Sequence, residues 1–313
     1  MYWDYLLYFV ITVAILFKGA SFFKVEVHGL KVNETKANIH FVGYQDETKK
    51  SEAEVLKGKT TREIFNYYVK NQKYIMHAGG AIDGHIYTNS LEALEENYKK
   101  GNRIFEIDLN YTNDHQLVMI HGWTESDYQG KLGVPYAGVM NKATFKNTLL
   151  HGKYHTMTLE DLIKFMRSHP YAYFILNLKG GSKAAVSKDA LTELVNLANR
   201  NPNILDRLVI WGYNLNVIKT ARRIYNFDLI TLSYNDPKDM PTEVNTKEKM
   251  IAYCVKNNIS SLIFAEDTFD EEIATLGKKA GIYSFVFTID NEKKAQGFLD
   301  KNATMILSNH LLN

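Results

Sequence analysis

The feature that most constrains the fold is a regular alternation of β-rich runs and amphipathic segments after Tyr74. Such alternation is typical of repeated βα units and a parallel sheet. Nine short runs have strand character: 74–77, 103–109, 117–121, 173–178, 208–211, 229–233, 261–265, 283–289 and 304–307. The second and third are joined by 110–116, which is too short for a helix and rich in turn formers, so one of them is an extra strand. The remaining eight predict a closed (β/α)8 TIM barrel over residues 74–313, in the α/β class.

An open, doubly wound sheet is the alternative arrangement of the same elements. Dinucleotide-binding sheets of that kind carry a G-x-G-x-x-G turn after the first strand. Residues 77–84 follow the first run here, read H-A-G-G-A-I-D-G, and lack that spacing. The barrel is therefore the preferred prediction.

Composition excludes several classes of function. The 313 residues are 45% hydrophobic and 23% charged, which is typical of a folded globular chain. Lys and Arg number 37 against 35 Asp and Glu, a formal net charge of +2, and there is no basic block, so nucleic acid is not an expected partner. The single cysteine, Cys254, excludes an internal disulfide framework and a cysteine-based zinc site.

Two carboxylates one residue apart, Glu106 and Asp108, stand in the run 103–109. Residues i and i+2 of a strand point to the same side, so both acids project to the inside of a barrel while the apolar residues between and beside them pack outward. A hard divalent cation needs such a pair of oxygen ligands. Taken alone the E-x-D pattern is weak evidence, because exposed strand faces often carry alternating acids.

Two histidines end the strand runs on either side of this acid pair. His77 ends the run 74–77, and His121 ends the run 117–121. If both runs lie next to the acid-bearing strand, the site gains two imidazoles that can move protons near pH 7. A cation together with an acid and a base indicates phosphoester chemistry.

Five segments extend this pattern along the chain, in the order 77–80 (HAGG), 88–93 (TNSLEA), 105–109 (FEIDL), 118–121 (VMIH) and 158–162 (TLEDL). In this order they resemble the motifs of the glycerophosphodiester phosphodiesterases, a family within the wider group of PI-phospholipase-C-like barrels. The resemblance implies that His77 and His121 are the acid/base pair. It also implies that Glu106 and Asp108 are ligands of a divalent metal, Ca2+ or Mg2+.

The chain departs from the family pattern at positions that carry charge. Ala78 stands where the family has arginine after the first histidine, so a bidentate phosphate clamp is absent. Asn177 stands where the family has a further acidic metal ligand; an amide oxygen can still ligate Ca2+ or Mg2+ but supplies no charge. Asn309 stands where the family often has an aspartate. Lys179 keeps the family's lysine and is expected to bind the phosphate, and Trp123 is expected to line the pocket or stack on the substrate.

The residues and the resemblance together predict a metal-dependent phosphoric diester hydrolase. A metal held by Glu106, Asp108 and Asn177 would neutralise the phosphodiester, while one histidine deprotonates the attacking hydroxyl and the other protonates the leaving group. The expected substrate is a glycerophosphodiester, a phospholipid or a cell-envelope polymer. Two alternatives stay open: an impaired barrel that binds phosphorylated glycans or lipid head groups, and a phospholipase-D-like lipid phosphodiesterase.

The N-terminus differs in kind from the rest of the chain. From residue 2 to residue 23 the only charged side chains are those of Asp4 and Lys18, and residues 1–23 are predicted to be a single-pass membrane anchor. A cleaved signal peptide is the alternative, although no Lys or Arg precedes the apolar run. Residues 24–73 are more polar and predict a stalk or lead-in, with a helix at 61–71. An anchor on a hydrolase favours a catalytic domain outside the cytoplasm, although the lysines after the span favour the opposite orientation.

Overall fold

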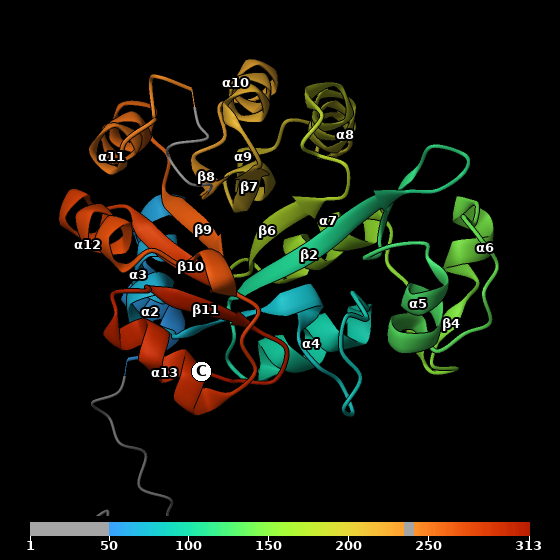
Figure 1. The fold of residues 1–313 in the computed structure, drawn as a ribbon. Coiled ribbons are helices and arrows are strands. Elements are labelled where there is room, and N and C mark those ends of the chain that lie inside the picture. Colours follow the sequence, from blue (N-terminus) through green and yellow to red (C-terminus); the bar gives the residue numbers. More distant parts are fainter. Residues whose placement is uncertain (1–49, 235–240) are drawn as a thin grey trace, which may run out of the picture. The chain divides into compact units, whose positions relative to one another are not determined.

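The protein is described by a computed structural model over residues 50–234 and 241–313. Its main feature is a closed barrel of parallel strands (Figure 1). In order around the barrel these are β1 (Tyr74–Met76), β2 (Ile104–Tyr111), β6 (Tyr173–Leu178), β7 (Leu208–Gly212), β8 (Leu229–Ser233), β9 (Ser261–Ala265), β10 (Tyr283–Phe287) and β11 (Met305–Ser308). The barrel closes because β1 pairs with both β2 and β11. The predicted TIM barrel is confirmed.

Amphipathic helices cover the outside of the barrel, as the alternation along the sequence predicts. They are α4 (Leu91–Lys99), α7 (Leu159–Ser168), α8 (Ala184–Leu197), α10 (Leu215–Ile224), α11 (Lys247–Lys256), α12 (Glu271–Ala280) and α13 (Glu292–Asp300), with the short turns α9 (Pro202–Leu205) and η4 (Glu266–Thr268). Helix α4 begins where the Ser90 side chain accepts a hydrogen bond from the Ala93 amide. Helix α7 begins at a capping box formed by Thr158 and Asp161.

The extra strand is β3 (Leu117–Met119), which pairs antiparallel with β2 and does not enter the barrel. An insertion follows it and precedes α7; it lies at one side of the barrel in Figure 1. The insertion consists of α5 (Glu125–Asp127), η2 (Tyr128–Leu132), α6 (Lys142–Lys146), β4 (Leu149–Leu150) and β5 (Tyr154–His155). Its apolar side chains, which include Tyr128 and Phe145, form one core with Ala93 of α4 and Val118 of β3. These elements are too short for hydrophobic periodicity to reveal them in the sequence.

The amino-terminal end of the barrel is filled by α3 (Thr61–Asn71), together with Leu56 of α2 (Glu52–Leu56). Phe65 of α3 is fully buried, with its ring centre 5.4 Å from that of Tyr173 and 6.5 Å from that of Tyr283, the first residues of β6 and β10. The Tyr173 hydroxyl donates to the Thr61 carbonyl at 2.7 Å. Because one end of the barrel is packed in this way, functional groups are expected at the opposite end, where the strands finish.

The compact unit that contains the barrel spans Ala53–Asn313. The sequence predicts a barrel that begins at residue 74 after a lead-in at 24–73. Helix α3, which lies in this lead-in, packs on the barrel through its buried Phe65, Tyr68 and Val69. The expected anchor at residues 1–23 lies outside the described residues. Within the described part of the chain, no helix is both long enough and apolar enough to cross a membrane.

Candidate active site

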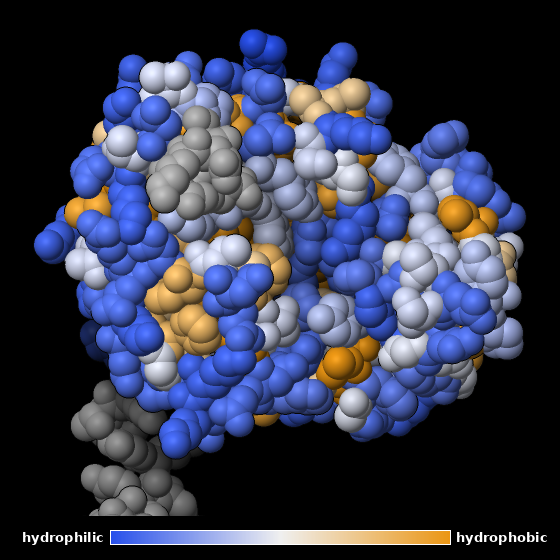
Figure 2. All heavy atoms as spheres, viewed as in Figure 1, coloured by the Kyte–Doolittle hydropathy of each residue, from blue (hydrophilic) through white to orange (hydrophobic). Residues whose placement is uncertain are grey.

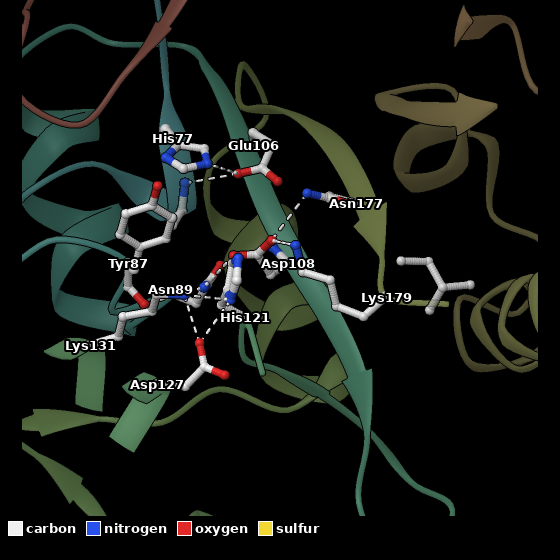
Figure 3. Close-up of polar contacts among 12 residues, drawn as sticks. His77, Tyr87, Asn89, Glu106, Asp108, His121, Asp127, Lys131, Asn177 and Lys179 are labelled. Atoms are coloured by element: carbon white, nitrogen blue, oxygen red, sulfur yellow. Dashed lines mark hydrogen bonds and ion pairs between the residues drawn. The ribbon is translucent and has the colours of Figure 1, made fainter. Parts of the chain in front are cut away.

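Alternation along β2 divides its side chains as the sequence predicts. Phe105, Ile107 and Leu109 belong to the apolar core between the strands and the helices. Glu106 and Asp108 lie on the other face of the strand, inside the barrel, and both are completely buried. Around them the site is built from the ends of neighbouring strands and from loops (Figure 3). On the face of the molecule seen in Figure 2, hydrophilic side chains line a recess between the barrel and the insertion.

Glu106 has one engaged oxygen and one unpartnered oxygen. Its Oε2 accepts a hydrogen bond from the Ala78 amide at 2.9 Å and lies 3.7 Å from Nε2 of His77. Its Oε1 is buried and has no hydrogen-bond partner among the described residues. Burial and the neighbouring Asp108 carboxylate raise the pKa of Glu106, because both disfavour its charged form.

Asp108 has protein partners on both of its carboxylate oxygens. The Lys179 ammonium lies 2.6 Å from Oδ1, and the Asn177 amide nitrogen donates to the same oxygen at 3.1 Å. The amide nitrogen of Asn89 donates to Oδ2 at 3.0 Å, while its amide oxygen accepts from the Asp108 backbone N–H at 2.9 Å. Burial opposes ionisation of Asp108, but Lys179 and His77 outweigh it and hold the pKa of Asp108 below its usual value.

His77 follows β1 in the turn η1 (His77–Gly79) and is buried. Its Nδ1 lies 2.9 Å from the amide oxygen of Asn309, which follows β11. The Asn309 amide nitrogen donates to Asp290 at 2.7 Å, which fixes the orientation of the amide and presents its oxygen to the histidine. Nδ1 of His77 is therefore the donor, and Nε2 faces Glu106.

His121 is held by charged groups of the insertion. Its Nδ1 lies 2.9 Å from Oδ1 of Asp127, and the Lys131 ammonium lies 2.6 Å from both of these atoms. Burial and the positive charges of Lys179 and Lys131 lower the pKa of His121, against the opposing effect of Asp108 and Asp127. Burial opposes ionisation of Asp127, but hydrogen bonds from Lys131 and Thr124 hold its pKa well below the usual range.

Tyr87 lies between the two histidines (Figure 3). Its ring centre is 4.7 Å from that of His77 and 5.4 Å from that of His121, and both contacts are edge-on. The Lys131 ammonium lies 4.9 Å from the centre of the same ring, within cation–π range. Tyr87 has a backbone φ of 59°, in the left-handed region that few non-glycine residues adopt. One aromatic side chain thus contacts both imidazoles and the ammonium group beside them.

The structure brings together His77, Glu106, Asp108, His121, Asn177 and Lys179 of the residues expected from the sequence. Trp123 is the exception. Its indole N–H donates to the Tyr111 carbonyl at 2.9 Å, and its ring contacts those of Phe145 and Tyr128 in the insertion. The expected stacking of Trp123 on a substrate stays a prediction that these contacts do not support.

Six residues of the site, or of its supports, have no role predicted from the sequence: Tyr87, Asn89, Asp127, Lys131, Asp290 and Tyr213, whose hydroxyl donates to the Asn177 amide oxygen. Asn89 carried a signal, since it stands in the TNSLEA segment that contributes to the family resemblance. Asp127 carried one too, because Thr124 and Asp127 have the spacing of a capping box. Tyr87 and Lys131 had no local signal, because only the packing of a loop and of the insertion brings them to the histidines.

A closed (β/α)8 barrel with two histidines beside two paired carboxylates has the arrangement expected of a phosphoric diester hydrolase, and the family match places the chain in that class. The chain belongs to the glycerophosphoryl diester phosphodiesterase family, whose model matches residues 77–312. A search of curated proteins gives no match.

Solved structures share the fold of this chain. A phosphodiesterase from Oleispira antarctica, solved with the product sn-glycerol-3-phosphate, is 16% identical, with 76% of this chain and 93% of that chain aligned at a TM-score of 0.59. A glycerophosphodiester phosphodiesterase from Parabacteroides distasonis is 20% identical over 76% of this chain and 92% of that one, with a TM-score of 0.56. A protein from Galdieria sulphuraria described as a putative member is 18% identical over 76% and 94%, with a TM-score of 0.59.

The family generally uses divalent metals, and the described residues can be tested for such a site. Within 50–234 and 241–313, no group of three or more His, Cys, Asp or Glu side chains is arranged to hold a metal ion. Of the three expected ligands, Asp108 is engaged on both oxygens, and Asn177 turns its amide nitrogen toward Asp108. Glu106 alone offers an unpartnered oxygen. These side chains, as they are arranged, do not fit a divalent cation.

Proposed function

We propose that the chain hydrolyses glycerophosphodiesters, or the glycerophosphodiester units of a lipid or cell-envelope polymer, by acid/base catalysis with His77 and His121. The observation that carries this proposal is the anchoring of the two imidazoles on either side of Tyr87. Each has its Nδ1 beside a fixed oxygen, at 2.9 Å from Asn309 and 2.9 Å from Asp127 respectively. The proton transfers are therefore assigned to the Nε2 atoms, of which that of His77 lies 3.7 Å from Oε2 of Glu106. The product bound to the Oleispira antarctica relative supports the same substrate class.

In the proposed reaction, one histidine takes the proton of the attacking water as the new P–O bond forms. The other histidine gives a proton to the leaving alkoxide as the old P–O bond breaks, so the products are a phosphate monoester and an alcohol. The charge of the phosphodiester is matched by the ammonium groups of Lys131 and Lys179, whose side chains are 23% and 25% exposed. This chain has Ala78 where the family pattern has an arginine, so these two lysines are the positive charges proposed for the phosphate. No step is assigned to a metal, because the donor set does not fit one.

The test is turnover of a simple glycerophosphodiester, such as glycerophosphocholine, by the full chain. We expect release of glycerol 3-phosphate, followed by a coupled assay, and a phosphate monoester signal by phosphorus NMR. The variants His77→Ala and His121→Ala should lose this activity, while His115→Asn, at an exposed position in the β2–β3 turn, should keep it. A cyclic phosphate product indicates the phospholipase-D-like reaction, and binding of the ligand without turnover indicates the binding module; either outcome contradicts the proposal.

We further propose that an N-terminal anchor at residues 1–23 holds the catalytic domain outside the cytoplasm. The apolar composition of that segment supports the anchor, and the outward orientation rests on the hydrolase character of the domain, against the lysines that follow the span. A C-terminal epitope tag on the full chain should be digested when protease is added to intact cells. A tag that is digested only after lysis contradicts the proposed orientation.

A further inference from the structure

The positive charge of this site comes from the chain itself. Lys179 lies on the segment that continues β6, two residues after Asn177, and its ammonium group is 2.6 Å from Oδ1 of Asp108. An N–O distance of this length is that of a charge-assisted hydrogen bond. The ammonium therefore contacts the same carboxylate oxygen that would coordinate a cation held by the E-x-D pair. A dication on that same oxygen would meet a like charge within a few ångströms.

The second oxygen of Asp108 is also committed. Asn89 donates to it at 3.0 Å and accepts from the Asp108 backbone N–H at 2.9 Å, so the amide of Asn89 is fixed by two bonds to one residue. Reversing this amide would set its oxygen against the carboxylate oxygen and its nitrogen against an N–H group. Both oxygens of Asp108 are thus satisfied by donors that the fold holds in place.

Asn177 points its donor, and not its acceptor, at the acid pair. Its amide nitrogen donates to Asp108 at 3.1 Å, and its amide oxygen accepts a hydrogen bond from the Tyr213 hydroxyl, which follows β7. The reverse orientation would place two oxygens 3.1 Å apart with no proton between them. An acidic side chain at this position could only accept hydrogen bonds. Asn177 instead donates one to the Asp108 carboxylate, as Lys179 does.

The ligands that remain are too few for a hard cation. Ca2+ takes six to eight oxygen ligands and Mg2+ takes six in a near-ideal octahedron. Of the four carboxylate oxygens of the pair, Oε1 of Glu106 is the one without a partner in the described part of the chain, since the Ala78 amide donates to Oε2 at 2.9 Å. Substitution of the third acid by Asn177 also leaves the site with one negative charge fewer than the family pattern.

We propose that Lys179 takes the place of the divalent cation, so that the phosphodiester binds against a lysine ammonium held by Asp108 and the reaction does not require a metal. The inference deepens the proposed function and rests on it for the identity of the bound group. It concerns one substitution relative to the family pattern and one residue that the pattern also has: Asn177 replaces an acidic ligand, and Lys179, which the family keeps, supplies the positive charge from its ion pair with Asp108.

The first experiment measures metal binding without substrate, so its result does not depend on activity. Isothermal titration of the chelator-treated full chain with CaCl2, MgCl2 and MnCl2 should show no site tighter than about 1 mM. The double variant Asn177→Glu with Lys179→Met restores the family's acid and removes the competing ammonium, and it should bind one of these cations at least about tenfold more tightly than the wild type. Thermal unfolding curves of both proteins check that the variant is folded.

The matched control is Asp108→Asn. A wild-type site tighter than about 1 mM that is lost in Asp108→Asn overturns the proposal, whether or not the double variant folds. Binding that survives in Asp108→Asn lies elsewhere on the chain and leaves the E-x-D pair without a metal, as proposed.

The second experiment measures turnover. Activity on glycerophosphocholine should change less than about twofold after chelation, and Lys179→Met should lower kcat/KM by about 100-fold. Lys179→Arg should recover part of that loss because it restores the charge. Loss of activity on chelation and its recovery with Ca2+ or Mg2+ overturn the inference but leave the proposed function intact. Absence of turnover in every condition contradicts the proposed function, while the titration still decides the inference about the metal.

Discussion

The two histidines of the site have the same expected task and very different surroundings. His77 is buried against the barrel, and its Nδ1 meets a neutral amide, Asn309, held in turn by Asp290. The His121 side chain is 34% exposed, and its Nδ1 lies between a carboxylate and an ammonium, Asp127 and Lys131, both from the insertion. The barrel thus fixes one imidazole through neutral hydrogen bonds, and the insertion fixes the other through charge.

The surroundings of His77 belong to the barrel, whereas those of His121 belong to the insertion and can change more easily. The partners of His77 lie at the ends of barrel strands, where a change of position disturbs the sheet. The partners of His121 lie on α5 and η2, short elements outside the barrel strands that pack in an apolar cluster separate from the two clusters of the barrel. Substitutions in the insertion can therefore alter the charge around His121 without altering the barrel.

The largest expected effect is common to both histidines. We expect His77→Ala and His121→Ala each to lower kcat/KM for a glycerophosphodiester by about 1,000-fold, because each removes a group that transfers a proton. Steady-state kinetics and circular dichroism on the purified variants check this result. If one variant keeps more than a tenth of the wild-type activity, the two-histidine mechanism is wrong. Only the other histidine would then act in catalysis.

The next effect tests the charged anchor of His121. Replacement of Asp127 by Asn removes the negative charge beside Nδ1 and should lower kcat by about 10- to 100-fold with little change in KM. Asp127 also caps α5 with Thr124, so Thr124→Ala is the matched control. The control should lose about 1 kcal/mol of stability and keep its kcat. Equal losses of kcat in the two variants would mean that Asp127 acts through the helix cap and not on the histidine.

A smaller effect concerns the pH dependence of His121. Burial is the largest of the causes that lower the pKa of His121, and the charges of Lys179 and Lys131 lower it further. Lys131→Met removes one of these charges, so the pKa of His121 should rise and the imidazole should stay protonated to a higher pH. The measurement is an NMR titration of the imidazole protons. Lys153→Met, at an exposed ion pair with Asp83, should leave the titration of His121 unchanged; a shift in that control, or none in Lys131→Met, refutes the electrostatic role of Lys131.

The smallest effect is expected at Trp123. Its contacts lie within the insertion and at the end of β2, so Trp123→Phe should change KM and kcat by less than about twofold while it destabilises the insertion by about 1 kcal/mol. Kinetics and chemical denaturation measure the two quantities separately. A KM that rises about tenfold would restore the stacking role expected from the sequence and would place part of the substrate against the insertion.

Much of the barrel, unlike the insertion, could be predicted from the sequence because its sequence signals are local. The alternation of strand and helix patterns identified the barrel, and the two-residue period of β2 determined that Glu106 and Asp108 face inward. The positions of His77 and His121 at strand ends followed from the same reading. The packing of α3 on the barrel was not predicted, since its amphipathic face does not say which surface it covers.

What the sequence by itself determined is the barrel and the residue types that meet at its carboxyl end, because period and spacing are properties of neighbouring residues. Only the tertiary structure decided how these residues engage one another. Asn177 turns its donor toward Asp108 because the carboxylate can only accept, and the Tyr213 hydroxyl, which follows the next strand, lies against the Asn177 amide oxygen. Lys131 reaches His121 because the insertion packs in one apolar core with residues of α4 and β3. Hydrogen-bond direction and ion pairing depend on partners far apart in the chain, and it is these partners that make the site differ from its family pattern.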